Sequence, residues 1–275
     1  MKRMDAWQGR AGRWSLVACL LWSALLGLSA GLSGCAGSPP TDDLITASDE
    51  PEERRRARIR MQLAVGYFEQ GKTTVALDEV KQALNIDPSF TDAYNLRGLI
   101  YVRLNDARLA EESFRRALAL SPNDPDVLQN YGWMLCQQSR FAEGIQAFTR
   151  ALAQPTYSDR AKTWLTKGLC QARAGQPQEA EQSLNRSFEL DAVNPVTSYN
   201  LAALLYQRGD DVRAQFYIRR LNNSELANAQ TLWLGIKVER RLGNTLARDQ
   251  LASQLRNRFA NSREWSLYER GAYDE

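Results

Sequence analysis

A period of about 34 residues runs through this sequence and restricts the chain to a linear array of similar units. Four glycines interrupt helical patterns, and Asn105 and Ser139 complete the series with spacings of 34, 34, 36, 34 and 34 residues. The full series is Gly71, Asn105, Ser139, Gly175, Gly209 and Gly243. Glycine and asparagine tolerate the left-handed backbone that a helix end often needs. A unit of this length holds two helices and a tight turn, and it buries its apolar face only against its neighbours.

Small and large residues recur with the same period. The residue five positions after each turn residue is small, except for Arg248. The residue seven positions before each turn residue is also small in most repeats, and a bulky apolar residue lies nine positions after several of the turn residues. The first set is Ala76, Ala110, Gly144, Ala180 and Ala214, the second is Ala64, Gly98, Gly132, Gly168, Ala202 and the larger Ile236, and the third includes Val80, Phe114, Phe148 and Leu184. Small residues suit close helix crossings, and the period of 3.6 without alternating runs predicts an all-α chain.

This pattern resembles the tetratricopeptide repeat, a helix-turn-helix unit of 34 residues, in six units from 57 to about 262. The resemblance implies an all-α, right-handed superhelix of about six repeats, with the first helix of each repeat on the concave face. Arg97 and Lys167 stand where leucine is usual, and Arg248 stands where alanine is usual. These departures leave the exact register of repeats 2, 4 and 6 open.

The N-terminus has the pattern of an export signal. Four basic residues precede an apolar run from Trp14 to Leu28, which is shorter than a membrane-spanning helix requires. The ending Leu-Ser-Gly-Cys resembles the bacterial lipobox, which implies that Cys35 is the lipid-modified first residue of the mature protein; the alternative is an ordinary signal peptide with a cysteine nearby. Ala36 follows in place of the aspartate that usually retains lipoproteins at the inner membrane. This implies a lipid anchor on the periplasmic face of the outer membrane.

We therefore expect four segments: a signal peptide (1–34), the lipidated cysteine with a polar, flexible tether (35–48), the repeat domain (49–265) and a C-terminal tail (266–275). Residues 1–34 hold four of the 35 Lys and Arg residues and one of the 32 Asp and Glu residues, which leaves 31 of each in the mature chain. Because a nucleic-acid-binding protein normally has a basic surface, we expect no nucleic-acid partner. We expect a monomer.

Enzymatic chemistry has no candidate residues here. The sequence has no histidine, the commonest general base and metal ligand, and no phosphate loop, nucleophile elbow or zinc motif. The adjacent carboxylates Glu111-Glu112 and Asp210-Asp211 point apart and are expected to be solvated. We predict that the protein is not an enzyme and uses no metal and no cofactor.

Two cysteines remain for a disulfide once Cys19 leaves with the signal and Cys35 takes lipid. Cys136 and Cys170 are 34 residues apart on first helices whose repeats are 36 apart, so they are offset by two helix positions. Equivalent positions in stacked helices lie roughly 8–10 Å apart, too far for a disulfide, and the offset can bring the pair closer. We predict a bond between repeats 3 and 4; the alternative is two buried free thiols.

A partner-binding surface is expected on the first helices of repeats 1 and 2. They carry the apolar cluster Met61, Val65, Phe68, Leu99 and Val102. Exposed apolar grooves usually mark recognition sites, and methionine and aromatic side chains suit them as anchors. The alternative is inter-repeat core, because a register error of one position would turn these side chains inward.

Four stretches narrow the resemblance further. They are RIRMQLAVGYFEQG (58–71), NYGWMLC (130–136), LWLGIK (232–237) and FANSRE (259–264). They resemble the type IV pilus biogenesis/stability lipoproteins of the PilF/PilW family, although Ala260 stands where proline is frequent. The resemblance implies a pilotin that binds the secretin PilQ through its first repeats and promotes the outer-membrane localisation and multimerisation of PilQ. The alternative is a tetratricopeptide lipoprotein scaffold of another envelope machine, for outer-membrane protein assembly or peptidoglycan-synthase regulation.

Overall fold

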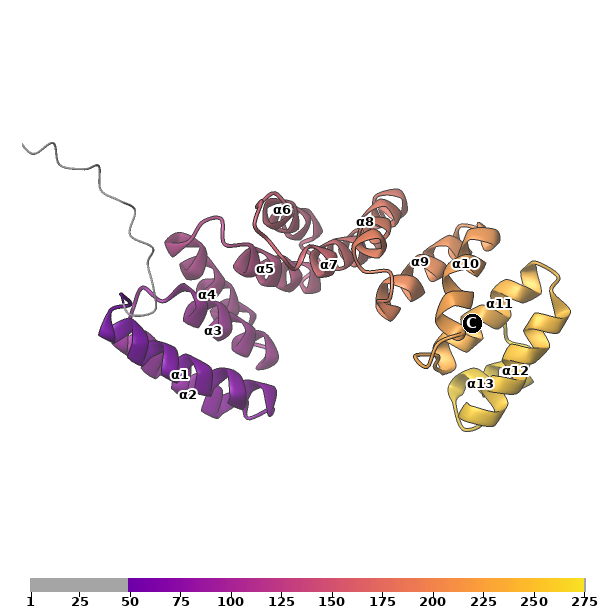
Figure 1. The fold of residues 1–275 in the computed structure, drawn as a ribbon, viewed down its shortest axis with the longest axis horizontal. Coiled ribbons are helices and arrows are strands. Elements are labelled where there is room, and N and C mark those ends of the chain that lie inside the picture. Colours follow the sequence, from indigo (N-terminus) through magenta and orange to yellow (C-terminus); the bar gives the residue numbers. More distant parts are fainter. Residues whose placement is uncertain (1–48, 275) are drawn as a thin grey trace, which may run out of the picture. The chain divides into compact units, whose positions relative to one another are not determined.

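The computed structural model describes residues 49–274, which form thirteen α-helices and no strand (Figure 1). The helices are α1 (Glu52–Glu69), α2 (Thr73–Ile86), α3 (Thr91–Arg103), α4 (Ala107–Leu120), α5 (Pro125–Gln137), α6 (Phe141–Leu152), α7 (Arg160–Arg173), α8 (Pro177–Leu190), α9 (Pro195–Gln207), α10 (Asp211–Asn222), α11 (Ala229–Arg241), α12 (Thr245–Phe259) and α13 (Arg263–Glu269). From α1 to α12 the helices pack in consecutive pairs, and each pair packs on the next. The predicted all-α superhelix of six stacked repeats is confirmed.

The signal peptide, Cys35 and the tether lie outside the described residues. At the other end, α13 extends past residue 265, where the sequence suggests that the repeat domain ends. Within residues 49–274, no helix has both the length and the apolar character needed to cross a membrane.

The six turns share one backbone geometry. Their central residues have φ between 58° and 79°, including the two that are not glycine, Asn105 and Ser139. In every turn the next residue donates its N–H to the carbonyl five positions earlier at 2.9 Å, as Lys72 does to Tyr67. This is the bond that closes a helix ending in a left-handed residue. The 34-residue spacing of the turn residues is therefore the spacing of the points at which the first helices end.

The small positions lie where the two helices of a repeat cross. A Cβ atom on Gly98 would lie 2.6 Å from the ring of Phe114, and one on Gly132 would lie 3.0 Å from the carbonyl oxygen of Gly144. Such distances are shorter than van der Waals contact, so a larger side chain would push the helices apart. The bulky residues opposite are fully buried, which makes each crossing the core of its repeat.

The charged residues at leucine positions pack beside aromatic rings that lie three residues earlier on the same helix. The guanidinium of Arg97 lies 4.9 Å from the centroid of Tyr94, and its Nε donates to Ser113 at 2.9 Å. The ammonium of Lys167 lies 5.0 Å from the ring of Trp164. Long basic side chains can cover apolar surface in this way while their charged ends reach polar groups or solvent.

Candidate partner-binding surface

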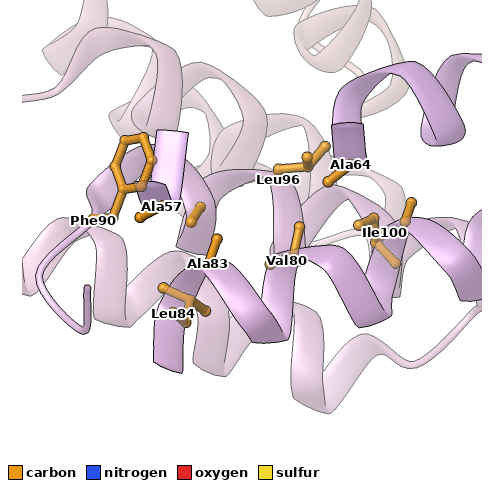
Figure 2. Close-up of a cluster of buried hydrophobic side chains, with 10 residues drawn as sticks. Ala57, Ala64, Val80, Ala83, Leu84, Phe90, Leu96 and Ile100 are labelled. Atoms are coloured by element: carbon orange, nitrogen blue, oxygen red, sulfur yellow. The ribbon is translucent and has the colours of Figure 1, made fainter. Parts of the chain in front are cut away.

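Met61, Val65 and Phe68 lie on one face of α1, because residues three and four apart in a helix share a face. All three side chains are half-buried and pack against the apolar cluster of repeats 1 and 2, drawn in Figure 2. The core of this cluster is Ala57, Ala64, Ala76, Val80, Ala83, Leu84, Phe90, Ala93, Leu96 and Ile100. Each of the three residues therefore contributes part of its surface to the core and leaves part accessible.

Leu99 and Val102, on α3, are also half-buried, but they pack against a different cluster. That cluster belongs to repeats 2 and 3 and contains Phe114, Met134 and Leu135. The structure thus divides the five sequence-predicted residues between two neighbouring clusters, and none of the five is fully buried. Their contact with a partner stays a prediction.

A residue that the sequence analysis missed lies directly on this surface. Arg103, at the end of α3, places its guanidinium 3.8 Å from the ring centroid of Phe68 and donates to the carbonyl oxygen of Phe68 at 2.6 Å. A cation over an aromatic face stabilises the pair by about 0.5–1 kcal/mol at an exposed site. Arg103 therefore holds the Phe68 ring and covers part of it.

The same arrangement recurs near the other end of the array. Arg241 on α11 lies 3.9 Å from the ring centroid of Tyr206 on α9 and donates to the carbonyl oxygen of Tyr206 at 2.7 Å. In both pairs the arginine follows the aromatic residue by 35 positions. The spacing of 35 residues is one more than the repeat length, and it places an arginine beside an aromatic residue of the preceding first helix. This spacing is the sequence signal from which both pairs could have been predicted.

Acidic residues gather where α3 and α5 begin. Burial, followed by the charge of Asp124, raises the pKa of Asp92 and that of Asp126 above the ordinary aspartate value. The charges of Arg54, acting on Asp92, and of Lys162, acting on Asp126, have the opposite effect on these pKa values, so basic side chains of the chain itself offset part of the repulsion. Among residues 49–274, no group of three or more Cys, Asp or Glu side chains is arranged to hold a metal ion.

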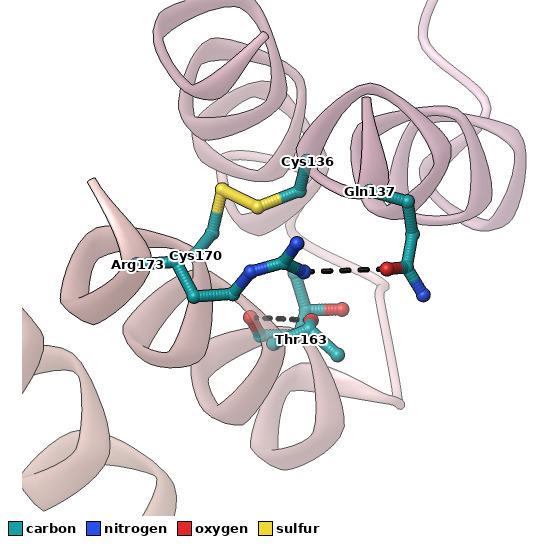
Figure 3. Close-up of a disulfide and its surroundings, with 6 residues drawn as sticks. Cys136, Gln137, Thr163, Cys170 and Arg173 are labelled. Atoms are coloured by element: carbon teal, nitrogen blue, oxygen red, sulfur yellow. Dashed lines mark hydrogen bonds between the residues drawn. A yellow bond between two sulfur atoms is a disulfide. The ribbon is translucent and has the colours of Figure 1, made fainter. Parts of the chain in front are cut away.

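Cys136 on α5 and Cys170 on α7 are both fully buried, and their sulfur atoms are joined in the structure (Figure 3). Their Cα atoms are 5.8 Å apart, within the usual range for a disulfide. Beside them Arg173 donates to Gln137 at 3.3 Å, a second link between the same two helices. Oxidation of the pair in the native protein is our prediction.

Comparisons with known proteins agree with the repeat architecture. Models of the tetratricopeptide repeat match residues 91–124, 113–146 and 132–195, and a further TPR repeat model matches residues 66–105. The type IV pilus assembly protein PilF of Pseudomonas aeruginosa is 31% identical over 245 residues, which cover 88% of this chain and 95% of that protein. The chain belongs to the PilF family. It is therefore a tetratricopeptide protein of type IV pilus biogenesis.

Solved structures of the PilF family share this fold along nearly their whole length. The structure of Pseudomonas aeruginosa PilF superposes with a TM-score of 0.73 at 27% identity, covering 80% of this chain and all of that one. The crystal structure of PilW, described as a widely conserved type IV pilus biogenesis factor, gives a TM-score of 0.71 at 34% identity, covering 77% of this chain and 97% of that one. The likeness thus extends over the six repeats and is not confined to a single unit.

Proposed function

We propose that this protein is a pilotin: a lipoprotein, anchored through Cys35 to the periplasmic face of the outer membrane, that binds the secretin PilQ and promotes its localisation and multimerisation. The observation that carries the proposal is the similarity to PilF over 95% of the length of that protein. The lipobox-like ending before Cys35 supports the anchor. No chemistry is needed, because a protein that binds one state of its partner shifts the assembly equilibrium by mass action.

The binding surface proposed for PilQ is the accessible part of Met61, Val65, Phe68, Leu99 and Val102. Half-buried apolar side chains suit this role, because the core fixes their rotamers before the partner arrives and little conformational entropy is lost on binding. Arg103 restrains the Phe68 ring in the same way. The acidic residues at the starts of α3 and α5 favour a PilQ segment that combines apolar side chains with a basic group.

The test is an assay of heat-resistant PilQ multimers in a strain that lacks this protein. Complementation with the wild type is expected to restore the multimers, and Phe68→Asp is expected not to, because it places a charge within the apolar surface. Phe216→Asp is a control for the same change at an exposed position: Phe216, on α10, is an aromatic side chain with 59% exposure, and the substitution there is expected to restore multimers fully.

Separate outcomes address the two parts of the proposal. Full restoration by Phe68→Asp would move the PilQ-binding surface elsewhere in the array. Normal PilQ multimers in the strain that lacks the protein would contradict the pilotin role itself. Cys35→Ser is expected to release the protein from the outer-membrane fraction, and retention of this variant there would contradict the lipid anchor.

A further inference from the structure

The chain after α13 folds back onto the first helix of repeat 6. Backbone hydrogen bonds from the N–H groups of Gly271 (3.0 Å) and Ala272 (2.9 Å) to carbonyls of α13 reverse its direction. The ring of Tyr273 then stacks on Trp233 of α11, with the centroids 5.3 Å apart and the planes 23° apart. The guanidinium of Arg240, also on α11, lies 4.0 Å from the centroid of Tyr273. We call residues 271–274 the tail segment.

The surface beside the tail segment is aromatic and cationic. The ammonium of Lys237 lies 5.5 Å from the ring centroid of Tyr206 and 5.6 Å from that of Trp233. Arg241 lies over the same Tyr206 ring. Burial lowers the pKa of Lys237, and the carboxylate of Asp274 in the tail segment acts in the opposite direction by favouring the charged ammonium.

This surface occupies the same repeat positions as the apolar surface of repeat 1. Trp233, Lys237 and Arg240 precede the turn residue Gly243 by ten, six and three positions. Met61, Val65 and Phe68 precede Gly71 by the same ten, six and three positions. Both sets thus lie on the first-helix face, where equivalent residues project in the same direction from equivalent helices.

We propose that this aromatic–cationic surface is a second protein-binding site, and that the tail segment occupies it within the same chain. The surface consists of Tyr206, Lys237, Arg240 and Arg241, together with Trp233, whose side chain is only 5% exposed with the Tyr273 ring stacked on it. Its partner is a segment of another protein in which a tyrosine is followed by an acidic residue. The tyrosine replaces Tyr273 between the Trp233 ring and the Arg240 guanidinium, and the carboxylate replaces that of Asp274, whose charge favours the ammonium form of Lys237.

The tail segment competes with any free segment for this site because it is covalently attached to the same chain. A short tether gives an effective concentration on the order of millimolar, so a free segment of equal intrinsic affinity competes poorly. For an intrinsic Kd of about 100 μM, this competition weakens the apparent affinity for a free segment about tenfold or more. Removing the ring of Tyr273 is therefore expected to open the site.

The experiment measures fluorescence anisotropy of a labelled peptide with the sequence of residues 269–274, titrated with the full chain in detergent. The Tyr273→Ala variant is expected to bind this peptide at least tenfold more tightly than the wild type. Adding Lys237→Glu to that variant is expected to weaken binding at least tenfold. Adding Lys81→Glu, a control on α2 in repeat 1, is expected to leave binding unchanged.

Equal affinities for the wild type and Tyr273→Ala would refute occupancy by the tail segment. Absence of binding to folded Tyr273→Ala at millimolar peptide, or binding that Lys237→Glu leaves intact, would refute the site. If Tyr273→Ala does not fold, hydrogen exchange of the wild type tests whether a free peptide displaces the tail segment. Millimolar peptide is expected to accelerate exchange of the amides of residues 271–274, and unchanged exchange there would overturn the proposal.

Discussion

Reduction of the disulfide between Cys136 and Cys170 is expected to destabilise the array strongly. The bond closes a loop with a sequence separation of 34 residues. In the chain-entropy model, a cross-link over a loop of this length lowers the entropy of the unfolded chain enough to stabilise the folded state by about 4 kcal/mol at 25 °C. Both cysteines are fully buried, so the reduced thiols stay in the same apolar cluster and the folded state changes little. The effect should arise almost wholly in the unfolded chain.

The assay is urea unfolding followed by circular dichroism, with oxidised protein compared to the same protein after reduction in denaturant and refolding. For an m-value of about 3 kcal/mol/M, the loss of about 4 kcal/mol lowers the urea midpoint by about 1.3 M. The Cys136→Ala/Cys170→Ala variant controls for other effects of the reductant, and its midpoint should not respond. Coincident midpoints for oxidised and reduced wild type would refute the reasoning. Two free thiols in a non-reducing peptide map of native protein would refute the bond itself.

Two further predictions concern stability. Gly98→Ala is expected to lower the free energy of unfolding in urea by about 1–3 kcal/mol, because its Cβ would lie 2.6 Å from the Phe114 ring. Gly66→Ala is the control: no atom lies near the position of its Cβ, so this change is expected to be neutral or stabilising. Equal losses at both sites would contradict the crossing geometry. Burial raises the pKa of Glu239, but hydrogen bonds led by that from Arg219 outweigh it and leave the pKa below its ordinary 4.5. The stability from this lowered pKa is present above pH 4.5 and is lost as the pH falls through the folded pKa. Glu239→Gln should therefore be about 2 kcal/mol less stable than wild type at pH 7. The difference in unfolding free energy should shrink progressively as the pH falls below 4.5, and a difference that does not depend on pH would contradict this account.

The fold could be predicted from the sequence because its physical requirements recur with the period. A helix end with positive φ and a close crossing are each tied to one position in the unit, as at Gly71 and Gly98. Because these requirements recur in six repeats, the pattern remains recognisable even where single residues depart from it. Arg97 and Lys167 left the register open in the sequence, and the structure shows that neighbouring aromatic rings accommodate both without a shift.

The surface was harder to predict, because it depends on how far side chains reach between repeats. Arg103 lies beside Phe68 because the guanidinium spans from one first helix to the preceding one, and no property of the single repeat shows this. The tail segment has no repeat pattern at all. Its location depends on the stacking of Tyr273 on Trp233, residues 40 positions apart that belong to different kinds of segment.

The first helices of repeats 1 and 6 carry different side chains at equivalent positions, although their backbones have the same geometry. Repeat 1 presents Met61 and Val65 where repeat 6 presents Trp233 and Lys237. Because both repeats have the same helix-turn-helix backbone, the difference lies in the side chains, and for this reason we propose a different kind of segment for each end. Each repeat contacts chiefly its neighbours, so a substitution in repeat 1 leaves the chemistry of repeat 6 intact. Two linked sites can hold two protein segments with an avidity greater than either site gives alone, so the two proposals together predict that one array holds two segments at once.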